Sequence, residues 1–166
     1  MNGQARSSEA GGVTDRPVVR AARRDDAALI AGFNLAMARE TERRELDPQL
    51  VAQGVAAVLA DDRHGFYVLA DVGACAAGAL LVTYEWSDWR NAHMWWIQSV
   101  YVVPAARRMG VYRALYGHVL AQARAHGACG LRLYVEQHNR AARRVYRSMG
   151  MRDSGYRIYE QEFAAP

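Results

Sequence analysis

The chain has 166 residues, of which 51% are hydrophobic and 23% charged, so it can bury the core of one ordinary domain. The length excludes a large multidomain protein, and the composition excludes a wholly disordered chain. The formal net charge is +4, and all 21 basic residues are arginine. This composition excludes lysine Schiff-base chemistry and favours an anionic partner, such as a phosphorylated cofactor.

The two cysteines predict neither a metal site nor a disulfide. Cys75 and Cys129 lie far apart among small apolar residues, and neither belongs to a Cys-x-x-Cys pair. We therefore expect two buried thiols in a reduced, cytoplasmic protein. No apolar run is long enough for a membrane span, and residues 1–15, rich in Gly, Ser and Ala, predict a flexible tail without a signal peptide.

The first elements alternate between strand and helix signals. Residues 17–20 predict a short strand, and apolar side chains at three- and four-residue spacing in 27–40 predict an amphipathic helix. Asp47 followed by Pro48 predicts the N-cap and first position of a second helix, which continues to residue 60.

The second half adds strands before it returns to helices. We expect a hairpin over 66–70 and 76–84, a turn over 87–91, a central strand over 93–103, a helix from 111 to Gly127, a strand over 131–135, a helix over 139–149 and a final strand over 156–163. An antiparallel first half followed by one β-α-β crossover predicts a three-layer α/β/α sandwich on a mixed sheet, as a single domain over 16–166.

The segment Arg107-Arg108-Met109-Gly110-Val111-Tyr112 joins the central strand to the next helix. A helix N-terminus exposes free N–H groups and partial positive charge, and glycine lets an anion approach the backbone closely. The segment therefore predicts a phosphate-binding loop. It lacks the Gly-Lys-Ser/Thr of a Walker loop and the three glycines of a dinucleotide fingerprint, and a solvated basic helix cap is the alternative.

Two motifs together resemble the GNAT N-acetyltransferase superfamily. Arg107-x-x-Gly110-x-Tyr112 is similar to its motif A, and LRLYVEQHNRAARRVYRSMGM (residues 131–151) is similar to its motif B. The resemblance covers residues 16–163 and implies a sheet that splays between its fourth and fifth strands, where acetyl-CoA binds as co-substrate.

The resemblance also implies roles for individual residues. Amides from Arg108 to Arg113 would hold the pyrophosphate, and backbone groups of Val102 and Val103 would pair with the pantetheine arm. Asn139 would face the cofactor or act only as an N-cap, and Tyr146 would lie by the sulfur or pack as an ordinary core aromatic. The predicted cofactor set is Val102, Val103, Arg107, Arg108, Met109, Gly110, Val111, Tyr112, Arg113, Asn139 and Tyr146. The phenol of Tyr146 has an ordinary pKa of about 10 and so carries its proton at neutral pH, which makes Tyr146 the predicted general acid for the leaving thiolate.

The sequence departs from the family pattern at two places. Tyr112 stands where Gly or Ala is usual, so its ring must point away from the pyrophosphate, and residues 95–98 offer no carboxylate as a general base. The candidate bases are Glu40 and Glu85, with Glu42 and Asp88 beside them; each could also be a plain surface carboxylate. The tryptophans gathered in residues 86–96 could bind a cation, but cross-strand packing is the simpler interpretation.

These observations predict an N-acetyltransferase that moves an acetyl group from acetyl-CoA to a primary amine by direct attack in a ternary complex, with no metal. The acceptor would be a small molecule or a peptide, and the resemblance allows a homodimer. A non-catalytic acyl-CoA-binding domain of the same fold is the alternative. A nucleic-acid binder ranks last, because the arginines of residues 140–147 lack an accompanying stacking motif.

Overall fold

The computed structural model describes residues 16–161 and 163. The chain divides into two compact units, Met1–Leu133 and Tyr134–Pro166, which are described separately below. The expected flexible tail, residues 1–15, lies outside the described residues. The single domain expected over 16–166 stays a prediction.

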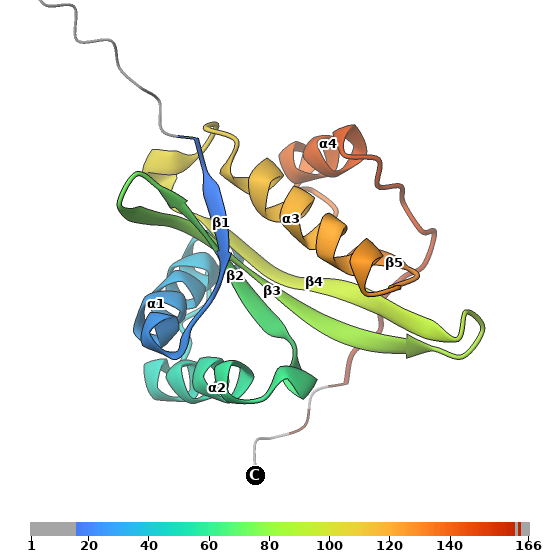
Figure 1. Cartoon of the computed structure of the whole chain (residues 1–166), viewed down its shortest axis with the longest axis horizontal. Helices are drawn as coiled ribbons and strands as arrows, with labels where there is room; N and C mark the ends of the chain where they lie inside the picture. Colours follow the sequence, from blue (N-terminus) through green and yellow to red (C-terminus); the bar gives the residue numbers. More distant parts are fainter. Residues whose placement is uncertain (1–15, 162, 164–166) are drawn as a thin grey trace, which may run out of the picture. The chain divides into compact units, whose positions relative to one another are not determined.

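A mixed sheet forms the centre of the first unit (Figure 1). Its strands, in spatial as well as chain order, are β1 (Val18–Ala21), β2 (Phe66–Val72), β3 (Cys75–Ser87), β4 (Ala92–Val102) and β5 (Gly130–Leu133). The first four pair antiparallel, whereas β4 and β5 pair parallel. The predicted mixed sheet is confirmed.

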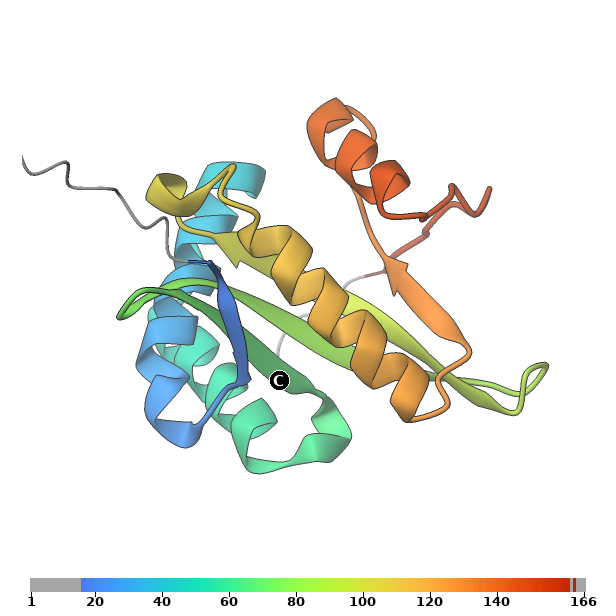
Figure 2. The ribbon, with the colours of Figure 1, turned by 45° about the horizontal axis from the view of Figure 1, so that its top comes forward.

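Helices cover both faces of this sheet. α1 (Ala27–Met37) and α2 (Pro48–Ala60) lie on one face, and α3 (Val111–Ala125) crosses the other (Figures 1 and 2). Successive side chains of a strand point to opposite faces, so the sheet contributes buried residues to the core on each of its two sides. Leu69 packs with Ile30 and Phe33 beneath α1, while its neighbour Val68 points to the opposite face. The side chains of Ile30 and Leu69 are fully buried, and each such burial contributes about 1.5–3 kcal/mol.

Local chemistry sets where α2 begins. The Asp47 carboxylate accepts hydrogen bonds from the N–H groups of Gln49, at 2.8 Å, and Leu50, at 3.4 Å, and Pro48 occupies the first helical position. The cap satisfies N–H groups that have no partner within the helix, and proline has no N–H to satisfy. The N-cap predicted at Asp47 is therefore present.

α3 begins very close to the sheet. A Cβ added at Gly78 of β3 would lie 2.6 Å from the Tyr101 carbonyl oxygen of β4 and 3.2 Å from the Val111 Cγ1 atom in the first turn of α3. Any side chain at this position would therefore force β4 or α3 to move. Gly78 fixes the height of the α3 N-terminus above β3 and β4.

The second unit contains α4 (Arg140–Ser148). Its N-cap is Asn139, whose side-chain oxygen accepts a hydrogen bond from the Ala142 N–H at 3.0 Å, and Gly150 follows the helix with a left-handed φ of 87°. The strand predicted over 156–163 is wrong: the described residues of this range form no strand, and Tyr156, Tyr159 and Phe163 are more than four-fifths exposed. Alternation of apolar residues marks a strand only where a neighbouring backbone is available for pairing.

The burial expected for both cysteines is also wrong. Cys75 is exposed, because it begins β3 directly after the two-residue turn at Gly73–Ala74, and Cys129 is only partly buried before β5. Both thiols are free. Within the described residues, no helix is long and apolar enough to cross a membrane.

Replacing Gly78 by alanine tests the close approach of α3 to the sheet. We expect Gly78→Ala to lower the free energy of unfolding by about 1–3 kcal/mol, because its Cβ would overlap the Tyr101 carbonyl. Urea denaturation measures the change. Gly117→Ala in the middle of α3 is the matched control, since a Cβ there meets nothing within 4 Å; it should be neutral or stabilise by up to about 1 kcal/mol. Equal stability of the two variants would contradict the proposed constraint.

Candidate active site

β4 continues beyond its partner β5. The two strands pair from Met94 to Ile97, and β4 then runs on to Val102 without β5 beside it. A β-bulge lies at the point of separation: the ladder passes from Val82–Ile97 to Leu81–Ser99, which leaves Gln98 as the extra residue. The predicted splay between the fourth and fifth strands is present.

The open edge of β4 exposes backbone hydrogen-bonding groups. The Val103 N–H donates to the Ala77 carbonyl of β3. Since the N–H and C=O of one trans peptide unit point in opposite directions, the Val102 carbonyl points away from β3. An extended ligand could pair with this edge as a further strand does. In the structure, the Val102 carbonyl accepts a hydrogen bond from Arg107 Nε at 3.0 Å.

The N-terminus of α3 lies at the same end of the sheet. No side chain caps it, and the N-cap Gly110 adopts a left-handed φ of 84°, with open space where a Cβ would be. Arg108 is also left-handed, at φ 69°, and Arg108 and Arg113 are exposed. Uncapped N–H groups, the helix dipole and two arginines together suit an anion such as a pyrophosphate. The residues present therefore fit the predicted phosphate-binding loop.

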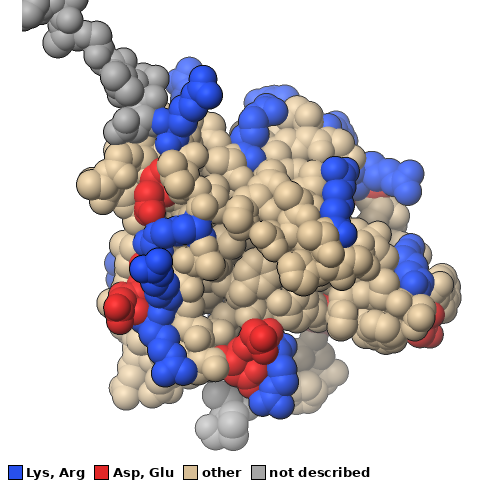
Figure 3. Space-filling view, viewed as in Figure 1, with Lys and Arg blue, Asp and Glu red and all other residues tan. Residues whose placement is uncertain are grey.

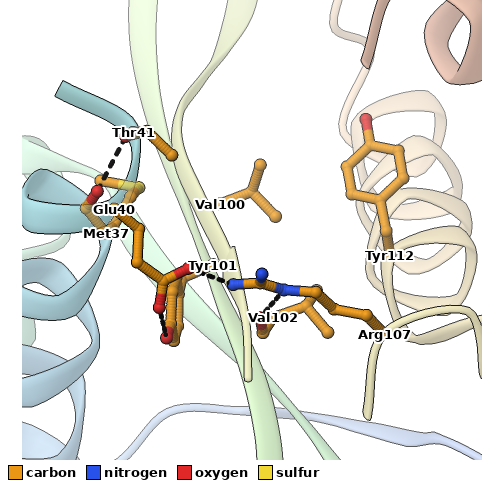
Figure 4. Close-up of a pocket in the computed structure, with 8 residues that line it drawn as sticks. All are labelled: Met37, Glu40, Thr41, Val100, Tyr101, Val102, Arg107 and Tyr112. Atoms are coloured by element: carbon orange, nitrogen blue, oxygen red, sulfur yellow. Dashed lines mark hydrogen bonds and ion pairs between the residues drawn. The ribbon is translucent and has the colours of Figure 1, made fainter. Parts of the chain in front are cut away.

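A pocket of about 380 Å³ lies between the end of α1 and the open stretch of β4 (Figure 4). We call it the Glu40 pocket; its lining residues are Met37, Glu40, Thr41, Val100, Tyr101, Val102, Arg107 and Tyr112. Glu40 lies on a π-helical turn, η2 (Ala38–Glu42), that continues α1. Such turns are rare and frequently occur at functional sites.

Glu40, Tyr101 and Arg107 form one hydrogen-bonded group in this pocket (Figure 4). The Tyr101 hydroxyl donates to Glu40 Oε1 at 2.7 Å, and Arg107 Nη2 donates to Glu40 Oε2. The guanidinium also lies over the Tyr101 ring, 5.8 Å from its centre. Hydrogen bonds from Arg107 and then from Tyr101 lower the pKa of Glu40 below its ordinary value, so Glu40 is held as a carboxylate.

This pairing changes what Glu40 and Arg107 can do. A carboxylate of lowered pKa, already holding a guanidinium, is a weak proton acceptor. The pKa of Arg107 is raised, chiefly by its hydrogen bond to Glu40, so it stays a cation. Its charge is directed to Glu40 and the Val102 carbonyl rather than to the first turn of α3.

Tyr112 lies within α3 and has the helical conformation expected for it. Its ring centre is 6.1 Å from that of Tyr116, one turn along the helix. In Figure 4 its hydroxyl end points away from Arg107. The tyrosine at the position where the family usually has a small residue therefore leaves the start of α3 accessible.

Glu85 lies on β3, opposite the start of β4. Its carboxylate accepts hydrogen bonds from Arg132 Nη1 at 3.0 Å and from Trp96 Nε1 at 2.5 Å. Glu85 pairs with Met94, and Met94 is about 23 Å along β4 from Tyr101, the partner of Glu40. The structure therefore does not bring Glu40 and Glu85 together.

The remaining candidates lie at the β3–β4 turn or on η2. Asp88 lies in the turn, where its side chain accepts from the Trp89 N–H at 2.8 Å. Trp89 is 88% exposed, whereas Trp95 is buried against Phe66 and Tyr84. Glu42 ends η2 and lines a second cavity, described below.

Asn139 and Tyr146 belong to the second unit. The cap made by Asn139 agrees with its simpler interpretation, and its role toward a cofactor stays a prediction. Tyr146 is partly buried on α4, and this burial raises the pKa of its phenol above the ordinary value. Tyr146 therefore remains protonated at neutral pH, as a general acid requires.

Sequence reasoning missed the role of Tyr101 and the pairing of Glu40 with Arg107. Arg107 and Glu40 are 67 residues apart in the sequence, and the sequence pattern indicates only that Tyr101 is one more aromatic residue of a central strand. No local pattern could connect the three. Among the residues described here, no group of three or more His, Cys, Asp or Glu is arranged to hold a metal ion.

Comparison with known proteins agrees with this geometry. Residues 29–151 match the Acetyltransferase (GNAT) family. A "possible acetyltransferase" from Clostridium difficile 630 is 39% identical, with a TM-score of 0.83, over 91% of this chain and 100% of its own.

More distant structures share the fold. The aminoglycoside N-acetyltransferase AAC(6')-Iy, solved with CoA, has a TM-score of 0.76 at 13% identity, over 91% of this chain and 97% of its own. A ribosomal-protein-alanine N-acetyltransferase from Brucella melitensis biovar Abortus 2308 has a TM-score of 0.71 at 16% identity, over 89% and 99%. Among curated proteins no sequence matches the chain. The match over residues 29–151 and the shared fold show that the chain belongs to the GNAT acetyltransferase family.

Proposed function

We propose that this acetyltransferase moves the acetyl group of acetyl-CoA to a primary amine by direct attack in a ternary complex. The observation that carries the proposal is the conjunction of the uncapped α3 N-terminus with the stretch Gln98–Val102 of β4, which pairs with β3 but has no β5 residue beside its other edge. The helix N-terminus suits a pyrophosphate, and the open edge of β4 suits an extended chain with amide groups. Both kinds of group occur in acetyl-CoA, which supplies the activated acetyl thioester.

The proposed anion site uses the amides from Arg108 to Arg113, with the charges of Arg108 and Arg113. Met109, Gly110, Val111 and Tyr112 contribute backbone, while Val102 and Val103 offer the edge of β4. Arg107 has a structural role instead: its hydrogen bonds to Glu40 and to the Val102 carbonyl hold together the residues that line the Glu40 pocket. A ligand that uses the Val102 carbonyl must displace the Arg107 Nε donor from it.

Proton transfer rests on Tyr146 and on an acceptor for the amine proton. We propose that Tyr146, kept neutral by burial, protonates the leaving thiolate, and that Asn139 fixes the start of its helix. This role requires the two units to form the single domain expected over 16–166. Glu40 and Glu85 are both held in ion pairs, so Glu42, which takes the proton directly or through a water molecule, is the better acceptor.

A non-catalytic acyl-CoA-binding domain is the second candidate, favoured by the absence of a carboxylate at residues 95–98. Nucleic acid is disfavoured as a partner. In Figure 3 acidic side chains lie beside the arginines on the side that carries β1 and α1, and Arg20 is paired with both Asp26 and Asp71 at 2.8 Å, so part of this positive charge is already neutralised. A cytoplasmic location and a homodimer stay predictions.

The anion site is tested by removing one charge at the start of α3. Asparagine tolerates the left-handed conformation of Arg108, so Arg108→Asn removes charge without backbone strain. We expect its dissociation constant for acetyl-CoA, measured by isothermal titration calorimetry, to rise about tenfold, as the loss of one charge-assisted contact implies. Arg124→Gln, which removes the same charge near the other end of α3, should bind like the wild type. Failure of the wild type to bind millimolar acetyl-CoA would refute the proposed function.

Replacing Tyr146 separates the enzyme from the sensor. Tyr146→Phe should lower kcat about 10²–10⁴-fold while acetyl-CoA binding is retained, because only the proton donor is lost. A raised pKa keeps the phenol protonated further up the pH scale. The wild-type rate should therefore fall only above the ordinary phenol pKa of about 10, and this alkaline limb should vanish in Tyr146→Phe. Thiol release followed against pH measures both. A sensor would release no thiol in either protein.

A further inference from the structure

A second cavity, of about 350 Å³, lies between the α1–α2 pair and the sheet. We call it the α1–α2 cavity. One wall is a face of α2, formed by Val51, Gly54, Val55 and Val58, and the opposite wall includes Tyr67 of β2. Val55 is 2% exposed and Tyr67 5% exposed, so the cavity reaches into the core of the first unit. Its volume is at the lower end of the range of small-molecule sites.

The α1–α2 cavity adjoins the Glu40 pocket. Met37 lines both spaces. The stretch of β4 beyond β5 also borders both spaces, with Gln98 and Ser99 in the α1–α2 cavity and Val100, Tyr101 and Val102 in the Glu40 pocket. A molecule in the α1–α2 cavity therefore has one end at the β4 edge, where the proposed transfer takes place.

The lining of the α1–α2 cavity is mainly aliphatic. Its buried polar groups satisfy each other in part, since Asn34 Nδ2 donates to the Tyr67 hydroxyl at 3.2 Å. Of the two carboxylates on η2, Glu40 is neutralised by Arg107, whereas Glu42 lines this cavity. The cavity thus combines a mainly aliphatic lining and a few uncharged polar groups with one carboxylate.

We propose that the α1–α2 cavity selects an acceptor with a single primary amino group on a compact apolar body, such as an arylalkylamine. This inference rests on the proposed function and specifies its substrate class. The apolar body lies against Val51, Val55 and Val58, and Glu42 attracts the ammonium group. A polyamine or an aminoglycoside would bring further charges against the valine wall, where they would lose their hydration without compensation.

Gly54 sets the size of the accepted amine. It lines the cavity from α2, and a Cβ added there meets nothing within 4 Å. A larger side chain therefore has room to enter the cavity without disturbing the helix, and helical propensity favours any such replacement of glycine. Gly54→Leu should fill the space that the apolar body of the amine requires.

The test is calorimetric titration of phenethylamine into CoA-saturated protein. We expect phenethylamine to bind the wild type and to bind Gly54→Leu at least tenfold more weakly. Ala56→Leu adds the same side chain at an exposed position of α2 outside the cavity lining, and it should bind like the wild type. Glu42→Gln should also weaken binding of phenethylamine, because it removes the charge that attracts the ammonium group. Unlike Gly54→Leu, it leaves the space for the apolar body of the amine unchanged.

Two outcomes would overturn the inference: equal binding of phenethylamine by the wild type and Gly54→Leu, or tighter binding of spermidine than of phenethylamine by the wild type. An absence of phenethylamine binding at millimolar concentration would overturn it as well. Binding of acetyl-CoA alone, measured on the same samples, is the separate test of the proposed function. The melting temperatures of all variants show whether each one is folded.

Discussion

The separation of β4 from β5 is the constraint on which the site depends. β4 pairs with β5 only from Met94 to Ile97, and the bulge at Gln98 marks the point where pairing ends. A strand that continued in register would bond its backbone groups to β5 and leave none for a ligand. Gly78 adds the second half of the arrangement, because it lets the first turn of α3 lie close to the same end of β4.

The group formed by Glu40, Tyr101 and Arg107 connects three parts of the chain. Glu40 comes from η2, Tyr101 from β4, and Arg107 from the segment that leads to α3. The three side chains hold the end of α1 against the open edge of the sheet. Glu40 thus has a defined structural part whether or not it takes part in proton transfer.

Most elements of the fold were predictable because their signals are local. Asp47–Pro48 marks the start of α2, and Gly127 and Gly150 follow the ends of α3 and α4. The strand expected over 156–163 failed because pairing depends on a partner that alternation does not supply, and Cys75 is exposed because it follows a turn. Within the candidate site, the anion loop was visible in one segment, whereas the contacts of Glu40 join residues far apart in sequence.

The π-helical turn η2 divides its two carboxylates between neighbouring spaces. Glu40 lines one pocket and Glu42 the other, although a single residue separates them. A π turn holds one residue more than an α turn, and each residue of a helix turns the chain by about 100°. Deleting one residue from η2 would restore regular α geometry and rotate everything after it by that angle. A length change of one residue would thus redirect a negative charge from one space to the other, and with it the side of α1 on which a cationic acceptor is attracted.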